Sequence, residues 1–412
     1  MTIEFTHNPR PTVGIEMELH LVDRLTGELV SASSQLLEEL GSAHPGGEHP
    51  KAKHELFQST VEIITGVCES PAEAGDDLRE TLAELRDAAA RRDLTLMSSG
   101  THPFGLAREQ LVSPDPRYRE LIESMQWPAR RLLICGLHVH VGVRDGARAI
   151  MIINELRRYL PLFLALSSSS PYFEGDDSGL ASTRSKVFES LPTAGLPPQL
   201  ADWSDFEEFM STLLESECIS SIREVWWDLR PHPDFGTIEF RMCDAAPTVR
   251  ESVALAGLAQ ALVARCDELA ETDSLPAPAR EWTVRENRWL AARFGIEAEL
   301  IVERPDTGHP DRRPVRELVR ELIEQLGPTA ERLGTTAQLD DVSDILEVGT
   351  GASRQRAVVE AGGTLVDVVH HLVESLAADA ISCLLYTSPS PRDGETHLVC
   401  RLLLENGGGG GG

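Results

Sequence analysis

Hydrophobic and polar residues alternate along residues 12–22, a pattern that predicts a β-strand. Successive strand residues point to opposite faces, so Met17 falls on the apolar face and Glu16 and Glu18 share the other. The predicted strand therefore carries two carboxylates side by side.

Further strand-like and helix-like segments follow in alternation, without an internal repeat. A short strand and a helix are expected within 29–41, extended chain over 53–67, and strands over 94–99, 131–143 and 236–242. Capping boxes predict helix starts at 70–73, 204–207 and 248–251, a helix over 147–166 is expected to break at Pro161, and 276–379 has mainly helical patterning.

Two segments depart from this pattern. Residues 167–198 are rich in Ser, Gly and Pro, which predicts a long ordered or lid-like loop of functional importance. Residues 382–412 contain low-complexity turn sequence and end in six glycines. We expect residues 1–381 to form a single catalytic domain and residues 382–412 to lie outside the native fold, as a non-native or disordered tail.

Composition narrows the class of protein. With 38 basic and 66 acidic residues the formal charge is -28, which argues against binding to nucleic acid or to anionic membranes. No stretch approaches the ~20 apolar residues that a membrane span requires. The seven cysteines form no C-x-x-C pair, so we expect reduced thiols and a cytoplasmic protein.

Lysine is almost absent, since it occurs only at Lys51, Lys53 and Lys186. There is also no G-x-x-x-x-G-K-[ST] loop. If nucleotide phosphates are bound, arginines and metal ions must take the place of the P-loop lysine.

The paired strand carboxylates imply a cation. Glu16 and Glu18 would lie ~6–7 Å apart along the strand, and their repulsion is on the order of 2 kcal/mol at an effective dielectric of about 20. A hard metal ion is the natural compensation.

A second carboxylate pair, Glu55 and Glu62, is separated by an odd number of residues. On a flat strand the two would lie on opposite faces, so a bend or bulge near Gln58 and Ser59 is needed if both face one site. The alternative is that both glutamates are simply solvated.

His138 and His140 share the polar face of the next predicted strand. Such histidines serve as metal ligands, as phosphate contacts or as hydrogen-bonded core groups. The surplus of glutamates favours magnesium or manganese over zinc.

Glu239 and Arg241 share a face of the strand at 236–242. Alone, they would be interpreted as a structural ion pair. Beside a metal-phosphate site they would supply one metal ligand and one bidentate phosphate clamp. The combined inventory suits phosphoryl transfer through two or three divalent ions, and no protease motif is present.

An ordered set of motifs between about residues 10 and 380 resembles the type 2 glutamate-cysteine ligases, also called YbdK-type carboxylate-amine ligases. The motifs are Gly14-Ile-Glu-Met-Glu18, residues 55–66, Gly100-Thr-His-Pro103, Gly136-Leu-His-Val-His140, Ser182-Thr-Arg184, residues 191–197, Gly236-Thr-Ile-Glu-Phe-Arg241 and Gly349-Thr-Gly-Ala-Ser-Arg354. Many relatives have a third acid where this chain has Met17, a position on the opposite strand face.

The resemblance implies an α+β fold like that of glutamine synthetase and the guanidino kinases, a curved antiparallel sheet forming a cradle with helices behind it. It also implies the reaction: ATP phosphorylates a substrate carboxylate, an amine attacks the acyl phosphate, and an amide, ADP and phosphate are released. The nominal substrates are L-glutamate and L-cysteine, and the product belongs to glutathione biosynthesis. The physiological acid and amine, and whether the chain forms a homodimer, stay open.

The resemblance also assigns roles to individual residues. Magnesium, or alternatively manganese, would be held by Glu16, Glu18, Glu55, Glu62 and Glu239, with His138 as a further ligand or phosphate contact. Arg241 would hold the transferring phosphoryl group, and Glu239, Arg241 and His138 form the catalytic set. His140, Arg184 and Arg230 are candidates for contacts with ATP or a substrate carboxylate. The competing hypotheses are a guanidino-kinase-like phosphotransferase and a nonenzymatic nucleotide-binding relative.

Overall fold

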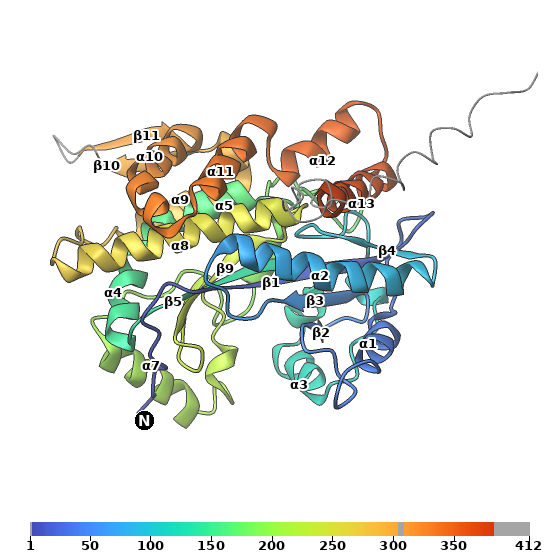
Figure 1. The fold of residues 1–412 in the computed structure, drawn as a ribbon, viewed down its shortest axis with the longest axis horizontal. Coiled ribbons are helices and arrows are strands. Elements are labelled where there is room, and N and C mark those ends of the chain that lie inside the picture. Colours follow the sequence, from blue (N-terminus) through green and yellow to red (C-terminus); the bar gives the residue numbers. More distant parts are fainter. Residues whose placement is uncertain (1, 304–308, 383–412) are drawn as a thin grey trace, which may run out of the picture.

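The largest sheet of the protein is antiparallel and has the strand order β2-β3-β1-β5-β9-β8, with β4 also paired to β1 (Figure 1). A computed structural model describes residues 2–303 and 309–382. The strands of this sheet are β1 Val13–Asp23, β2 Ala52–His54, β3 Thr60–Ile64, β4 Leu94–Met97, β5 Gly136–Gly142, β8 Leu229–His232 and β9 Thr237–Asp244. Two small hairpins are formed by β6 Tyr172–Phe173 with β7 Asp176–Asp177 and by β10 Glu299–Glu303 with β11 Pro310–Pro314.

Helices account for most of the remaining described chain. The α-helices are α1 Ser33–Gly41, α2 Pro71–Ala90, α3 Pro116–Met125, α4 Gly146–Leu156, α5 Leu160–Ser167, α6 Thr183–Phe188, α7 Trp203–Glu215, α8 Val249–Glu271, α9 Glu281–Phe294, α10 Val315–Leu333, α11 Thr336–Val348, α12 Gly351–Glu360 and α13 Leu365–Ser382. Short 3-10 turns occur at η1 Ala107–Glu109, η2 Ala129–Arg131, η3 Arg157–Tyr159, η4 Ile222–Glu224 and η5 Gly295–Glu297. The predicted mixture of helices and antiparallel strands is confirmed.

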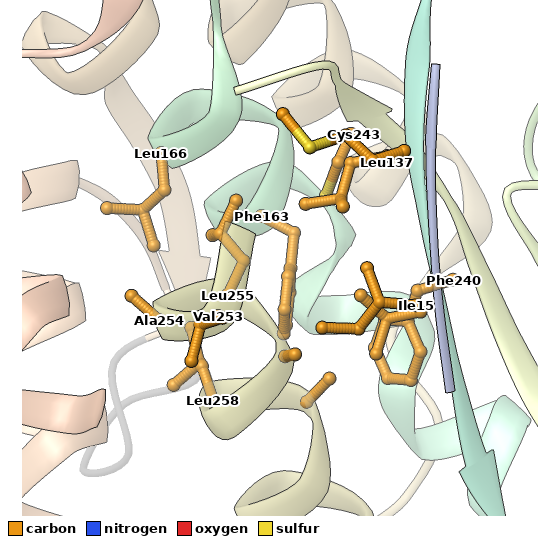
Figure 2. Close-up of a cluster of buried hydrophobic side chains, with 14 of the residues drawn as sticks. Ile15, Leu137, Phe163, Leu166, Phe240, Cys243, Val253, Ala254, Leu255 and Leu258 are labelled. Carbon is orange, nitrogen blue, oxygen red and sulfur yellow. The ribbon is translucent and has the colours of Figure 1, made fainter. Parts of the chain in front are cut away.

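The apolar face of the sheet is covered by α2, α5 and α8. Figure 2 shows Ile15 of β1, Leu137 of β5 and Phe240 of β9 facing Phe163 of α5 and Leu255 of α8. These side chains belong to one hydrophobic cluster, and burying them fixes which face of each strand points inward. Met17 is fully buried on this side, as predicted, so the opposite face is left for the charged residues.

The predicted helix starts are confirmed in two cases and wrong in one. Ser70 and Thr248 cap α2 and α8 by accepting hydrogen bonds from the backbone N–H groups of Glu73 and Glu251. The predicted cap at 204–207 is wrong, because Asp202 caps α7. An aspartate two residues earlier offers a charged acceptor to the same turn and starts the helix sooner.

Residues 53–67 were predicted to form one extended segment with a bend, but they form a hairpin. β2 and β3 pair antiparallel, with Lys53 opposite Glu62 and the chain reversing over residues 55–59. The turn is held from outside, since the backbone N–H of Gln58 donates to Leu111. A reversal, rather than a bulge, therefore removes the odd-spacing problem of Glu55 and Glu62.

Three other predicted segments are only partly as expected. The strand predicted over 131–143 begins only at Gly136, because η2 occupies the preceding turn. The helix over 147–166 is interrupted, but before Pro161: η3 separates α4 from α5, and Pro161 lies in the first turn of α5. The segment predicted as an ordered or lid-like loop over 167–198 is ordered, since Ser167–Ser170 are buried at its start and α6 lies within it.

Within 2–303 and 309–382, every helix is too short or too polar to cross a membrane. The tail predicted over 382–412 lies almost wholly outside the described residues, and both that prediction and the single-domain prediction stay untested.

Candidate active site

The polar face of the sheet forms the floor of a cleft with a volume of about 1210 Å³. All ten side chains predicted from the sequence line this cleft: Glu16, Glu18, Glu55, Glu62, His138, His140, Arg184, Arg230, Glu239 and Arg241. Segments up to 225 residues apart in the chain are thereby brought to one surface.

Strand register explains why these residues meet. Across the sheet, Glu62 of β3 lies opposite Glu18 of β1. His138 of β5 lies opposite Glu16, and Glu239 of β9 lies opposite both His140 and Arg230. Residues directly opposite on antiparallel strands share a face, so the pairing alone produces a continuous polar row.

Glu16 is held between two histidines. The Nδ1 of His138 donates to Glu16 Oε2 at 2.9 Å, and His140 Nε2 lies 3.3 Å from Glu16 Oε1. Burial would raise the pKa of Glu16, but the hydrogen bonds and charges of the two histidines hold that pKa well below its usual value. Glu16 is therefore an ionised carboxylate.

Glu55 and Glu62 have the opposite electrostatic environment. Burial and the neighbouring Glu18 raise the pKa of Glu55 to about 8. Burial, Glu16 and Glu55 raise the pKa of Glu62 well above its usual value. These acidic groups repel one another at close range and have too little positive charge beside them. A divalent cation bound between them would offset this repulsion.

Glu239 is clamped by two guanidinium groups. Arg230 donates to Glu239 Oε2 from Nε at 2.9 Å and lies 2.7 Å away through Nη2, while Arg241 contacts Oε1. Burial would raise the pKa of Glu239, but Arg241, Arg230 and His140 lower it. The same carboxylates affect His140. Burial would lower the pKa of His140, but Glu239 and Glu16 raise it above its usual value.

The donor atoms fit a cluster of hard cations. Three overlapping groups have ligand atoms within 4.8 Å of one another: Glu16, Glu62 and His138; Glu16, His140 and Glu239; and Glu18, Glu55 and Glu62. His140 Nε2 is buried and faces Glu16 Oε1 at 3.3 Å, while its Nδ1 lies 3.0 Å from the hydroxyl of Thr237. Since carboxylate oxygens dominate, the set suits Mg²⁺ or Mn²⁺.

Arg184 enters the cleft over Gly136. Its guanidinium is buried, with only 2% of the residue exposed, and makes long hydrogen bonds of 3.3–3.4 Å to the carbonyls of Arg241 and Met242. A β-carbon on Gly136 would lie 2.1 Å from Arg184 Nη2. Among the described residues no carboxylate lies within ion-pair distance of this guanidinium, so its charge is available to an anionic ligand.

Asp244 at the end of β9 holds α6, and thereby Arg184, in place. The buried carboxylate accepts hydrogen bonds from the hydroxyls of Ser170 and Ser182 and from the backbone N–H of Ser169. Ser182 is also the N-cap of α6. No role was predicted for Asp244 from the sequence, although it is a further carboxylate close to Glu239 and Arg241 in the chain.

Two motifs of the resemblance have structural roles in this fold. His102 accepts the backbone N–H of Gly105 at Nδ1 and donates from Nε2 to Gly27 at 2.8 Å, which shapes a turn. The segment beginning at Gly349 packs against the buried serines: Ala352 donates its N–H to Ser168, and Gln355 donates to Ser169. Both motifs therefore support the site from outside it.

The two walls of the cleft were not predicted. One wall is α3, from which Arg117 and Tyr118 face the cleft. The other is residues 217–226, called the rim below. Beside the rim, Phe235 is 55% exposed and stacks on His232 with centroids 4.1 Å apart. Exposed aromatic rings in a cleft cannot be told from surface residues by pattern alone.

A family model and the sequences of known proteins both relate this chain to glutamate-cysteine ligases of type 2. The model of glutamate-cysteine ligase family 2 matches residues 12–374. A protein of Thermobifida fusca that carries the provisional name glutamate--cysteine ligase 2 is 48% identical, with 96% of this chain and 99% of that protein covered. A similarly named protein of Frankia casuarinae is 51% identical, with 91% and 98% covered.

Solved structures share the fold at low identity. A glutamate–cysteine ligase of Francisella tularensis in complex with AMP superposes with a TM-score of 0.66 at 12% identity and 92% coverage of both chains. A bifunctional glutathione synthetase of Pasteurella multocida gives 0.64 at 13% identity, covering 90% of this chain and 53% of that one.

Proposed function

Because this chain belongs to glutamate-cysteine ligase family 2, and is thus a ligase, we propose that it uses ATP to join an amino-acid carboxylate to an amine. The nominal pair is L-glutamate and L-cysteine, and the intermediate is an acyl phosphate. The observation that carries this proposal is the convergence of five glutamates, two histidines and three arginines in one cleft.

The finer description of the fold is part of the proposal. We interpret the antiparallel sheet, with helices packed behind its apolar face and a charged cleft on the other, as the curved cradle of the glutamine synthetase and guanidino kinase type. The burial of Met17 opposite Glu16 and Glu18 supports this interpretation. We also propose that residues 1–381 act as one catalytic domain.

The acidic row would hold the divalent ions. Glu16 and Glu62 each belong to two of the three donor groups, and Glu18, Glu55, Glu239 and His138 would complete the set. Bound ions would neutralise the phosphate charge that develops during phosphoryl transfer. His138 keeps its Nδ1–H on Glu16, which orients the ring and leaves Nε2, 3.9 Å from Glu18, as the ligand nitrogen.

The cationic groups would bind the anionic parts of the substrates. Arg241, beside Glu239, would contact the phosphoryl group in transfer, and Arg184 would contact the nucleotide or a substrate carboxylate. His140, between Glu16 and Glu239, would serve as a ligand or phosphate contact. Holding both substrates on one rigid sheet supplies the orientation that amide formation requires.

A guanidino-kinase reaction has less support. That hypothesis would require a reactive cysteine near the arginines, but burial raises the pKa of Cys243 to about 12 and raises the pKa of Cys135 well above its usual value. Neither thiol is a thiolate at neutral pH.

ADP release should require both an acid and an amine. Incubation of the protein with ATP, Mg²⁺ and pairs of amino acids is expected to yield ADP and an amide in equal amounts, because the acyl phosphate needs an amine acceptor. Coupled ADP detection and mass spectrometry of the product provide the measurement. ADP release with a guanidino acceptor alone would favour the kinase and overturn the ligase.

Divalent cations should stabilise the protein without any substrate. The ions are expected to bind because they relieve repulsion among Glu18, Glu55 and Glu62. An ion that binds only the folded protein and is present at about 100 times its dissociation constant adds about 2.7 kcal/mol to the free energy of unfolding. We expect the melting temperature to rise by several degrees in Mg²⁺ or Mn²⁺ and to fall back with a chelator. An equal rise with NaCl at matched ionic strength would show simple screening instead.

A further inference from the structure

The guanidinium of Arg230 connects the floor of the cleft to the rim. It binds Glu239 through Nε and Nη2, and its Nη1 donates to the carbonyl oxygens of Arg223 at 3.1 Å and Val225 at 3.0 Å. Arg230 itself is only 8% exposed. Its hydrogen-bonding capacity is thus divided between one carboxylate of the sheet and two carbonyls of the rim.

The rim has a second, more exposed link to the sheet, since Arg223 Nη2 lies 3.8 Å from Asp234 Oδ2 between β8 and β9. Its apolar residues Ile219 and Val225 belong to a small cluster with Phe206 and Met210 of α7, separate from the main core. The carbonyl between the two that Arg230 holds, that of Glu224, accepts a hydrogen bond from Thr193 on a different segment. Arg230 is therefore a buried group that joins the rim to the charged row.

We propose that Arg230 is a positioning residue that couples Glu239 to the rim, so that the charge on Glu239 sets how firmly the rim is held against the cleft. A charge-assisted hydrogen bond is about twice as strong as a neutral one. Arg230 needs the full charge of Glu239 to remain between the carboxylate and the carbonyls. This role is additional to the contact with ATP or a substrate carboxylate that the sequence predicts for Arg230, and it rests on the proposed function only in treating Glu239 as part of the active site.

The rim offers a direct readout that does not depend on activity. Arg223 is exposed, and its carbonyl, the group that trypsin attacks, is held by Arg230. In Arg230→Lys, an ammonium cannot span the carboxylate and two carbonyls together. We expect trypsin to cut the bond after Arg223 about tenfold faster in this variant, because local opening of the rim becomes easier.

The coupling is tested from the other end by Glu239→Gln. Glu239→Gln should also accelerate trypsin cleavage after Arg223, because it weakens the hold of Glu239 on Arg230. In a protein that already carries Arg230→Lys, the further change Glu239→Gln should leave the cleavage rate unchanged. The matched control is Thr193→Val, which frees the adjacent Glu224 carbonyl but has no link to Glu239. In that background Glu239→Gln should retain its full effect.

These measurements are made on the full chain without substrates, so they stand even if no ligase activity is found. Circular dichroism and melting curves establish that each variant is folded, and Glu239→Gln tests the same link if Arg230→Lys does not fold. Unchanged cleavage in Glu239→Gln, or equal effects of Glu239→Gln in the Arg230→Lys and wild-type backgrounds, would overturn the proposal. For an active enzyme, MgATP with both amino acids should protect the rim in the wild type and protect it less in Arg230→Lys.

Discussion

Glu16→Gln is expected to lower kcat by at least about a hundredfold, the usual cost of removing one preorganised charge from a transition-state site. Glu16 belongs to two of the three donor groups and contacts both histidines. The substitution therefore removes a shared ligand and the partner that orients His138. The rate of ADP release under saturating Mg²⁺, ATP and amino acids is the measurement.

The fold should survive this change. Glutamine has the same shape, and removal of the charge weakens the attraction to His138 and His140 but relieves repulsion on Glu62, so we expect the melting temperature to shift by only about 5 °C or less. Glu38→Gln is a matched control, since Glu38 lines the same cleft but belongs to none of the donor groups. Full activity of Glu16→Gln would remove Glu16 from the proposed ion site.

Gly136→Ala is expected to lower kcat/KM by about a hundredfold, because displacement of a catalytic group by 1 Å has effects of this size. The new β-carbon would lie 2.1 Å from Arg184 Nη2 and 2.8 Å from its Cζ, so the guanidinium must move. Because Arg184 is proposed to contact an anionic substrate group, the loss should appear mainly as a raised KM. Steady-state kinetics with each substrate varied in turn would show which one Arg184 contacts.

Gly14→Ala provides the control for this experiment. Gly14 lies opposite His140 on the neighbouring strand, and a β-carbon there would meet the β-carbon of His140 at 3.6 Å, Thr65 Oγ1 at 3.9 Å and the carbonyl oxygen of Gly66 at 4.0 Å, all ordinary contacts. We expect activity to fall by less than about threefold, within the range of tolerated core changes. Equal losses in the two variants would mean that any side chain on this face disturbs the sheet and that Arg184 is not specifically displaced.

The sequence predicted the floor of the cleft well because strand alternation is a local property. Once Met17 is assigned to the core, Glu16 and Glu18 must face the other way. The same logic placed His138 with His140 and Glu239 with Arg241. Register between strands then brought these pairs together, and register follows from the apolar face that each strand buries.

The walls of the cleft could not be predicted in this way. The turn that carries Glu55 depends on a backbone contact with Leu111, far along the chain. The rim is positioned by Arg230 and Thr193, whose partners are backbone carbonyls that leave no trace in the side-chain pattern. Arg230 was predicted to contact ATP or a substrate carboxylate, and the side-chain pattern alone did not reveal its hydrogen bonds to these carbonyls.

The order of the strands along the chain determines when the residues of the proposed ion site come together during synthesis. β1 pairs with β3 close by in the chain, but its other long partner, β5, begins more than a hundred residues later, and β9 follows later still. Loops of this length close slowly, and contacts of such high sequence separation form late in folding. We therefore expect the proposed ion site to be complete in the nascent chain only after Glu239 of β9 has been synthesised, so that divalent ions would bind the sheet late in its assembly.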